Sequence, residues 1–168
     1  DAFIIADAAR TMPHTLRSLQ VSDEEEAALG MLTGFDLDLT RQITQTSNRI
    51  RGLFTQIHPC LERVVGPWLE HDAVLEVLAA WPTPAALKHA GKARIDAKLT
   101  KHGARRHTAW AGAILDAVDE QTVVVVGTEA AGLVVPHLAR QLIALHAQRV
   151  DVASHLEAMV EAHPLCPV

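Results

Sequence analysis

Cationic side chains that could hold phosphate groups are concentrated in one short segment of the sequence. Residues 88–107 contain seven lysines and arginines but a single acid, Asp96, so the segment carries +6 (seven minus one) while the whole chain carries −5. A basic segment on an acidic body is the electrostatic pattern of a nucleic-acid-binding surface, although a solvated helix face can carry the same charges. The candidate phosphate-binding residues are Lys88, Lys92, Arg94, Lys98, Lys101, Arg105 and Arg106.

Other kinds of site chemistry have no complete residue set in the sequence. There is no P-loop, no dinucleotide-binding fingerprint and no nucleophile elbow. The histidines of the C-terminal part are eight or nine residues apart and therefore do not share a compact helix face as paired metal ligands: His137, His146, His155 and His163. We therefore expect neither metal binding nor catalysis from this chain alone.

Composition restricts the class of protein further. Aromatic residues make up 4% of the chain and tyrosine is absent, which disfavours sheet-rich sandwiches and aromatic base-stacking platforms. Cys60 and Cys166 form neither a zinc-binding spacing nor a disulfide framework, as expected in a reducing cytosol. No apolar run is long enough to span a bilayer and no signal peptide is visible. Because the chain starts at Asp1 instead of a methionine, we expect it to be a fragment of a longer protein.

Two heptad series are the elements that would position the basic segment. Apolar residues at alternating three- and four-residue steps keep one helix face against a partner, which is the coiled-coil condition. An amphipathic helix on an ordinary core is the alternative. The predicted oligomer seam consists of Leu29, Leu32, Leu39, Ile43, Ile50 and Leu53 in the first series and Leu138, Leu142, Leu145, Val152 and Leu156 in the second. Asp36 and Thr46 are polar residues in the first series, and Arg149 occupies a position of the second.

The sequence predicts an all-α fold in which two long helices flank a cluster of short ones. The first long helix, about 23–57, begins at a capping box formed by Ser22 and Glu25, and the second runs from about 128 to 163. Pro136 should kink this second helix or mark its true start. Short helices are expected at 68–81, from Pro84 to Gly91, at 92–102 and at 106–120, whereas the valines at 123–126 fit either a strand or a buried turn.

Four sequence motifs resemble the IS110 family of insertion-sequence transposases. Asp1-Ala2-Phe3-Ile4-Ile5-Ala6 followed by Ala9-Arg10 resembles the end of that family's RuvC-like domain. Asn48-Arg49-Ile50-Arg51-Gly52-Leu53 is similar to the family's N-R-L-R-x-L stretch on its long helix. The other two motifs are Trp81-Pro82-Thr83-Pro84-Ala85-Ala86-Leu87 and Gly127-Thr128-Glu129-Ala130-Ala131, in the order in which the family has them.

The resemblance implies a bacterial cytoplasmic DNA recombinase guided by a structured RNA. Such a protein pairs a RuvC-like DEDD domain, which holds divalent metal (Mg²⁺), with a C-terminal domain that carries a serine nucleophile. Asp1 matches the fourth acid of the DEDD set, so three companion acids would precede it and the serine would follow Val168. The implied partners are DNA, guide RNA and further copies of the chain, as a dimer or a tetramer, and Asn48, Arg49 and Arg51 join the candidate nucleic-acid-binding residues.

On this interpretation the chain divides into five segments. Residues 1–21 end the RuvC-like domain, 22–58 and 128–163 are the long helices, 59–127 are the short-helix insert with the basic segment, and 164–168 lead into the serine domain. The predicted role is assembly and nucleic-acid binding in a transposase. A purely structural dimerisation module is the alternative, and a stand-alone enzyme is the least favoured interpretation.

Overall fold

The computed structural model describes residues 24–162 and, before them, residues 3, 7, 10 and 11. Within residues 24–162 it contains no strand, which confirms the all-α prediction. The elements are α2 (Glu24–Ile57), α3 (Pro59–Val65), the 3₁₀ helix η2 (Gly66–Trp68), α4 (Asp72–Ala80), α5 (Pro84–Lys101), α6 (His107–Glu120) and α7 (Thr128–Ala162). Asp1 and Ser22, two residues singled out in the sequence, lie outside the described residues.

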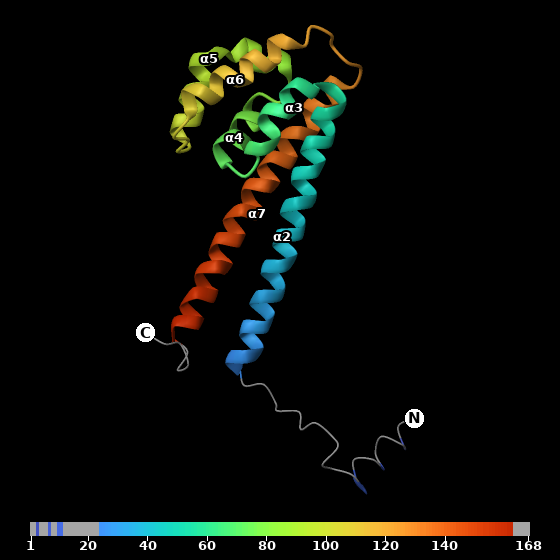
Figure 1. Cartoon of the computed structure of the whole chain (residues 1–168), viewed down its shortest axis with the longest axis vertical. Helices are drawn as coiled ribbons and strands as arrows, with labels where there is room; N and C mark the ends of the chain where they lie inside the picture. The colour runs from blue at the N-terminus through green and yellow to red at the C-terminus, as the bar shows by residue number, and fades with distance from the viewer. Residues whose placement is uncertain (1–2, 4–6, 8–9, 12–23, 163–168) are drawn as a thin grey trace.

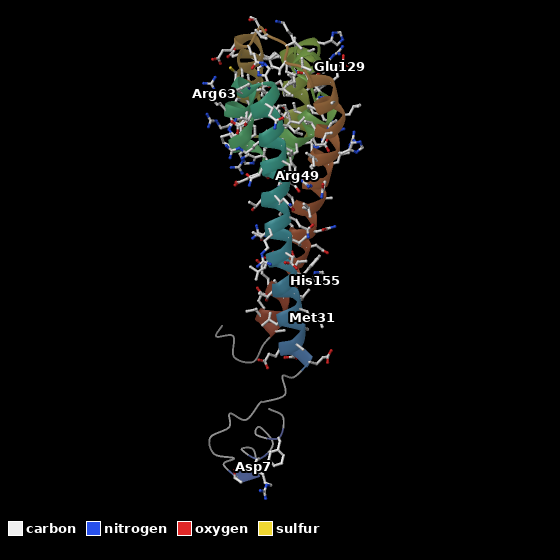
Figure 2. All side chains as sticks on the ribbon, turned by 90° about the vertical axis from the view of Figure 1, so that its right-hand side faces the viewer. Asp7, Met31, Arg49, Arg63, Glu129 and His155 are labelled. Atoms are coloured by element: carbon white, nitrogen blue, oxygen red, sulfur yellow. The ribbon has the colours of Figure 1, made fainter. Side chains whose placement is uncertain are left out.

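Helices α2 and α7 are long and run antiparallel, side by side (Figure 1). Helices α3 to α6 form a compact head around the end where α2 finishes and α7 begins. The other end of the pair, residues 24–43 of α2 and 145–162 of α7, is called the arm; it borders the head at Ile43 and His146 and then extends beyond it (Figure 2). The chain therefore rises along α2, builds the head and returns along α7.

The two heptad series pack against each other within one chain. Leu39 and Ile50 on α2 and Leu142, Leu145 and Val152 on α7 are all buried. Leu32, Ile43, Leu53, Leu138 and Leu156 are partly buried, and Leu29 is 37% exposed. The pairing of the seams is therefore intramolecular, an arrangement that the sequence had left open. Whether the same residues also serve an oligomer stays a prediction.

Near the head, the buried positions shift away from the heptad series by one residue. Phe54 and Ala139 are fully buried, whereas their neighbours Leu53 and Leu138 are only partly buried. At this end α2 and α7 contact the head as well as each other. A helix that covers a broad core follows the 3.6-residue period of the straight α-helix more closely than the 3.5-residue period of a seam. Coiled-coil geometry stays a prediction for the arm.

The head is held by one hydrophobic core to which every helix contributes. Its fully buried residues include Leu61, Leu75, Leu78, Leu87, Ile95, Leu99 and Ile114. Between Leu69 and Asp72 the chain leaves the 3₁₀ helix and enters α4, so the helix predicted over 68–81 begins four residues later than expected. The valine segment is neither a strand nor a buried turn, because Val123, Val124 and Val126 are 70%, 84% and 99% exposed in the loop before α7.

Local capping signals fix where the helices of the head begin and end. Thr83 Oγ1 accepts a hydrogen bond from the backbone N–H of Ala86 (3.2 Å), with Pro84 at the first helical position, as the sequence predicts. Gly91 (φ 72°, ψ 167°) interrupts α5 with a kink, and Gly103 (φ 80°) terminates the turn after it. Both glycines adopt a backbone conformation that residues with a Cβ rarely occupy. Pro136 lies inside α7, which begins eight residues earlier, at Thr128.

Candidate nucleic-acid interface

The basic segment lies on α5 and on the turn that joins α5 to α6, at the outer side of the head (Figure 1). Ile95 and Leu99 anchor the second half of α5 in the core and are fully buried. This burial leaves Arg94 and Lys101 exposed on the helix. They are seven residues apart, which is two helical turns, so they share one face.

Two of the seven predicted cations are engaged in ion pairs within the head. Lys88 Nζ lies 2.6 Å from Asp119 Oδ1, and Lys98 Nζ lies 2.9 Å from Glu76 Oε2. The hydrogen bond from Lys98, together with the nearby charges of Lys98 and His102, holds the pKa of the Glu76 carboxyl below its usual range. These two lysines join α5 to α6 and α4, so their first role is structural.

The other five cations form no ion pair or hydrogen bond with any described residue. Lys92, Arg94, Lys101, Arg105 and Arg106 are all exposed. Unpaired cations keep their charge available for an incoming phosphate and lose no partner on binding. The structure thus separates the predicted set into two structural lysines and five available cations, a separation that spacing in the sequence does not reveal.

The three candidate residues of the long helix belong to a different part of the surface. Arg51 Nε donates to Glu62 Oε1 of α3 at 2.7 Å, so this arginine ties α2 to the head. Asn48 and Arg49 are exposed on α2, with Arg49 labelled near the lower edge of the head in Figure 2. Helix α5 lies on the opposite side of the head from α2 (Figure 1), so the structure does not bring the two groups of candidates together.

Histidines connect the helices of the head through carboxylates. His146 Nδ1 on α7 lies 2.7 Å from Asp72 Oδ1, and His107 Nδ1 on α6 lies 2.8 Å from Asp96 Oδ1. The hydrogen bond with His107 is the main reason why the pKa of Asp96 lies below its usual value. Among the described residues, no group of three or more His, Cys, Asp or Glu side chains could hold a metal ion. Asp1 lies outside those residues, so the expectation of a divalent metal in the intact protein stays a prediction.

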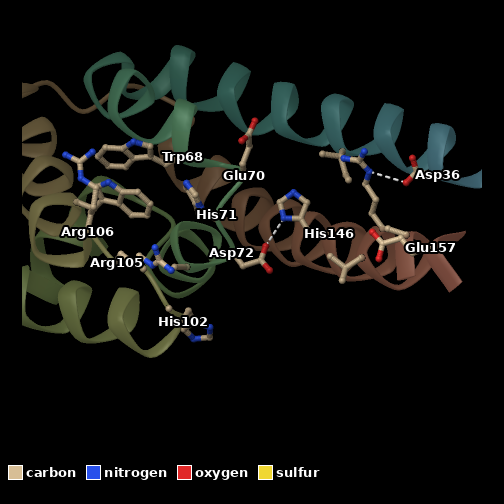
Figure 3. A pocket seen from close by; sticks show the side chains of 18 of the residues that line it. Asp36, Trp68, Glu70, His71, Asp72, His102, Arg105, Arg106, His146 and Glu157 are labelled. Carbon is tan, nitrogen blue, oxygen red and sulfur yellow. Dashed lines mark hydrogen bonds and ion pairs between the residues drawn. The ribbon is translucent and has the colours of Figure 1, made fainter. Parts of the chain in front are cut away.

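A groove of about 1360 Å³ lies between the head and the second half of α7 (Figure 3). Its walls are the η2–α4 connection, the α5–α6 turn, and the inner sides of α2 and α7. Arg105, Arg106 and Trp68 lie at one end of the groove, whereas Asp36 and Glu157 lie at the other. The groove therefore has a basic end, at Arg105 and Arg106, and an end with acidic residues, at Asp36 and Glu157.

Two tryptophans that are 42 positions apart in the sequence stack at the basic end of the groove. The ring centroids of Trp68 and Trp110 are 4.9 Å apart with an angle of 18° between the ring planes, and His71 lies 5.0 Å from Trp110. This pair was missed from the sequence, because the low aromatic content argued against any stacking surface. A local signal did exist: Arg106, the N-cap residue of α6, precedes Trp110 by four residues, a spacing that brings side chains near each other at a helix start.

Sequence comparisons identify the class of protein. A family model for DEDD transposases of the IS110 type, described as "Transposase", matches residues 1–59. The chain is 52% identical over 168 residues to the 43.6 kDa protein of insertion element IS110 from Streptomyces coelicolor, covering all of this chain and 42% of that protein. The chain belongs to the IS110 family of insertion-sequence transposases, which confirms the resemblance seen in the motifs.

Two further relatives agree with this assignment. The chain is 34% identical over 167 residues to the 42 kDa protein of insertion element IS900 from Mycobacterium paratuberculosis, covering 97% of this chain and 40% of that protein. It is also 34% identical over 145 residues to the 44.8 kDa protein of insertion element IS116 from Streptomyces clavuligerus, covering 86% and 36% respectively. The chain thus spans about two fifths of the length of these relatives. No solved structure matches it.

Within the described residues, no helix is both long and apolar enough to cross a membrane.

Proposed function

We propose that this part of the transposase binds nucleic acid through the basic segment of its head and assembles with further copies through its arm. The observation that carries the proposal is the set of five exposed cations without ion pairs on α5 and the α5–α6 turn: Lys92, Arg94, Lys101, Arg105 and Arg106. On a chain with a net charge of −5, such a concentration of available positive charge favours contact with phosphates.

Salt dependence tests the nucleic-acid half of the proposal. Each neutralised phosphate should contribute a slope of about −0.9 for duplex DNA, or about −0.7 for single strands, to the plot of log affinity against log salt. The double variant Arg94→Glu/Lys101→Glu should weaken binding at all sequences and make this slope shallower by about one unit per lost contact. The structure favours these positions over Lys98, whose replacement would also leave Glu76 without its partner.

A matched control separates a local effect from a general change in charge. Arg41 is exposed on the arm, outside the basic segment, and pairs with Asp38 one turn earlier. Arg41→Glu should leave the affinity nearly unchanged. If the wild-type chain binds neither RNA nor DNA at low salt, or if the double variant binds as well as Arg41→Glu does, the nucleic-acid half of the proposal is wrong and the purely structural alternative stands.

The assembly half is supported by apolar side chains that the arm leaves exposed. Met31 and Phe35 are 79% and 47% exposed, and their spacing of four residues places them on one side of α2. Leu37 on α2 and Val150 on α7 are also more than half exposed, at 53% and 68%. Two helices bury only one strip of each other, and exposed apolar residues such as Met31 and Phe35 on one side of such an arm are typical of a surface that packs against a further copy.

Light scattering tests whether a further copy packs here. Met31→Glu/Phe35→Glu should lower the oligomer mass while the helical content stays constant. Leu133→Glu, at a residue 74% exposed near the start of α7, should leave the mass unchanged. A wild-type chain that is monomeric at all accessible concentrations would overturn the assembly half.

The family assignment also supports a role for the intact protein. We propose that it catalyses metal-assisted DNA transposition guided by RNA, in which Asp1 is the fourth acid of the DEDD site and Mg²⁺ offsets charge on phosphate oxygens. The chain described here would hold such sites in place relative to the bound nucleic acid. Alanine substitution of Asp1 in a full-length protein should abolish strand transfer without changing the affinity of the head for nucleic acid.

A further inference from the structure

The aromatic pair in the groove has a geometry that suits an unpaired nucleobase. Trp110 is only 8% exposed and covers one face of Trp68 at a centroid distance of 4.9 Å. Trp68 is partly exposed and lines the groove. Its ring plane is therefore fixed by its neighbour while part of the indole stays accessible. A base that stacks on the accessible part of this indole meets a ring that is already held in place, which lowers the entropic cost of binding.

Cations lie where the phosphates of such a nucleotide would be. Arg106 is the N-cap residue of α6, four residues before Trp110, and Figure 3 shows its guanidinium group beside the indole of Trp68. Arg105, the preceding residue, also lines the groove. Both arginines belong to the five cations without ion pairs in the described part of the chain. A stacking surface next to free guanidinium groups is the combination that proteins use for single-stranded nucleic acid.

The opposite end of the groove limits how much of a strand it can take. Asp36 and Glu157 line that end, and Glu70 and Asp72 lie between the two ends (Figure 3). A phosphodiester chain that followed the whole groove would pass these four carboxylates, of which Asp36 pairs with Arg149 and Asp72 contacts His146, so the repulsion comes chiefly from Glu70 and Glu157. The strand should therefore cross the groove at its basic end and place only one or two bases against Trp68.

We infer that this basic end of the groove, formed by Trp68, Trp110, Arg105 and Arg106, is a stacking site for an unpaired base of a nucleic acid strand. The inference rests on the proposed nucleic-acid binding by the head and adds to it a preference for unpaired bases over paired ones. The exposed cations of α5 bind phosphates of any strand, whereas the stacking site accepts only a base that is free of its complementary partner. A looped or single-stranded segment of either RNA or DNA has this chemistry.

Tryptophan fluorescence provides a direct measurement of stacking. The chain contains three tryptophans, so a Trp81→Phe background leaves only Trp68 and Trp110 to report. We expect ten-residue oligouridylate or oligothymidylate to quench this signal at saturation. A strand of equal length made of abasic sites has the same phosphates without bases and should leave the signal almost unchanged. Comparing the affinities of oligouridylate and oligothymidylate at equal salt then shows whether RNA or DNA is the preferred source of the base.

Substitution of Trp68 separates this inference from the proposed function. Trp68→Leu should weaken binding of the single strand by about 5- to 100-fold while duplex of the same length binds within about twofold of wild type. Trp68→Phe retains an aromatic face and should recover most of the loss. Circular dichroism checks that both variants keep their helical content, and recovery by Trp68→Phe excludes a general folding defect as the cause.

Three results would overturn the stacking site. If nucleic acid binds with a steep salt slope but Trp68→Leu and wild type bind single strands equally, phosphate binding stands and stacking is wrong. If the abasic strand quenches as strongly as oligouridylate, the signal reports charge alone and stacking is again wrong. If raising the protein concentration changes the fluorescence and abolishes quenching, a second copy covers the groove instead. Absence of all nucleic-acid binding would overturn both this inference and the proposal on which it rests.

Discussion

Arg149 on α7 donates a hydrogen bond from Nε to Oδ1 of Asp36 on α2, at a distance of 3.1 Å. These residues are the charged positions of the two heptad series, 113 residues apart in the sequence. Each would be unfavourable in an apolar seam without a partner. Because they meet across the helix pair at the edge of the groove, their contact favours one alignment of α2 against α7.

Charge reversal at this pair should test its role in alignment. Asp36→Arg places two cations together and should lower the free energy of unfolding by about 0.5–1 kcal/mol, because both side chains are partly exposed to solvent. Arg149→Asp in the same chain should restore most of the loss. Urea denaturation followed by circular dichroism measures both effects, and high salt should diminish them. Asp38→Arg, which disturbs only the local pair with Arg41, is the matched control. A double variant no more stable than the single one would show that the pair does not couple the helices.

Truncating a buried side chain between α2 and α7 should lower the free energy of unfolding far more than the charge reversal at Asp36. Leu142 is fully buried on α7, and Leu142→Ala should lower the free energy of unfolding by about 2–5 kcal/mol through lost burial and the cavity left behind. Leu133 lies on the same helix but is 74% exposed, so Leu133→Ala should change the free energy of unfolding by less than about 0.5 kcal/mol. Equal effects of the two substitutions on the urea midpoint would contradict the packing of α7 described here.

Acidification should destabilise the head through His58. Its Nδ1 accepts a hydrogen bond from the backbone N–H of Leu61 (3.1 Å) and caps α3, while Nε2 is buried. Burial lowers the pKa of His58 below the usual 6.5. The unfolded chain therefore takes up a proton that the folded chain resists, and stability falls as the pH decreases through 6.5.

Two substitutions separate the cap from the titration. His58→Asn keeps an acceptor at the cap but does not titrate, so its stability should vary less between pH 7.5 and pH 5 than that of wild type. His58→Ala loses the acceptor and should cost about 1 kcal/mol even at neutral pH. Thermal melts across this pH range measure both. An unchanged pH dependence in His58→Asn would assign the acid sensitivity to other groups.

The kink in α5 should depend on glycine at position 91. Gly91 has φ 72°, so Gly91→Ala should destabilise the head by about 1–2 kcal/mol through backbone strain, although no atom lies within 4 Å of the added Cβ. Gly52 also has open space around it but lies inside α2, where Gly52→Ala should stabilise the protein by about 0.5–1 kcal/mol. Opposite signs in the shift of the melting temperature are the expected result. A stabilised Gly91→Ala would mean that α5 straightens in solution.

The ends of the elements were largely predictable, because their causes are local. Thr83 and Pro84 start α5, Gly103 ends the turn after it, and the acids from Glu24 onward lie in the first turn of α2. Each such signal acts on the backbone within a few residues. The valine loop was missed because four β-branched residues have the same composition whether they pair, pack or remain exposed.

The sequence by itself determined an all-helical chain with two long apolar series, one basic segment and motifs of a transposase family. Tertiary structure decided which side chains meet. It paired the two series within one chain, joined Lys88 and Lys98 to carboxylates, and left five cations available. It also brought Trp68 against Trp110 beside Arg106, in a chain whose composition argued against aromatic platforms. Helix formation depends on neighbours along the chain, whereas these contacts depend on how the hydrophobic faces of distant helices pack together.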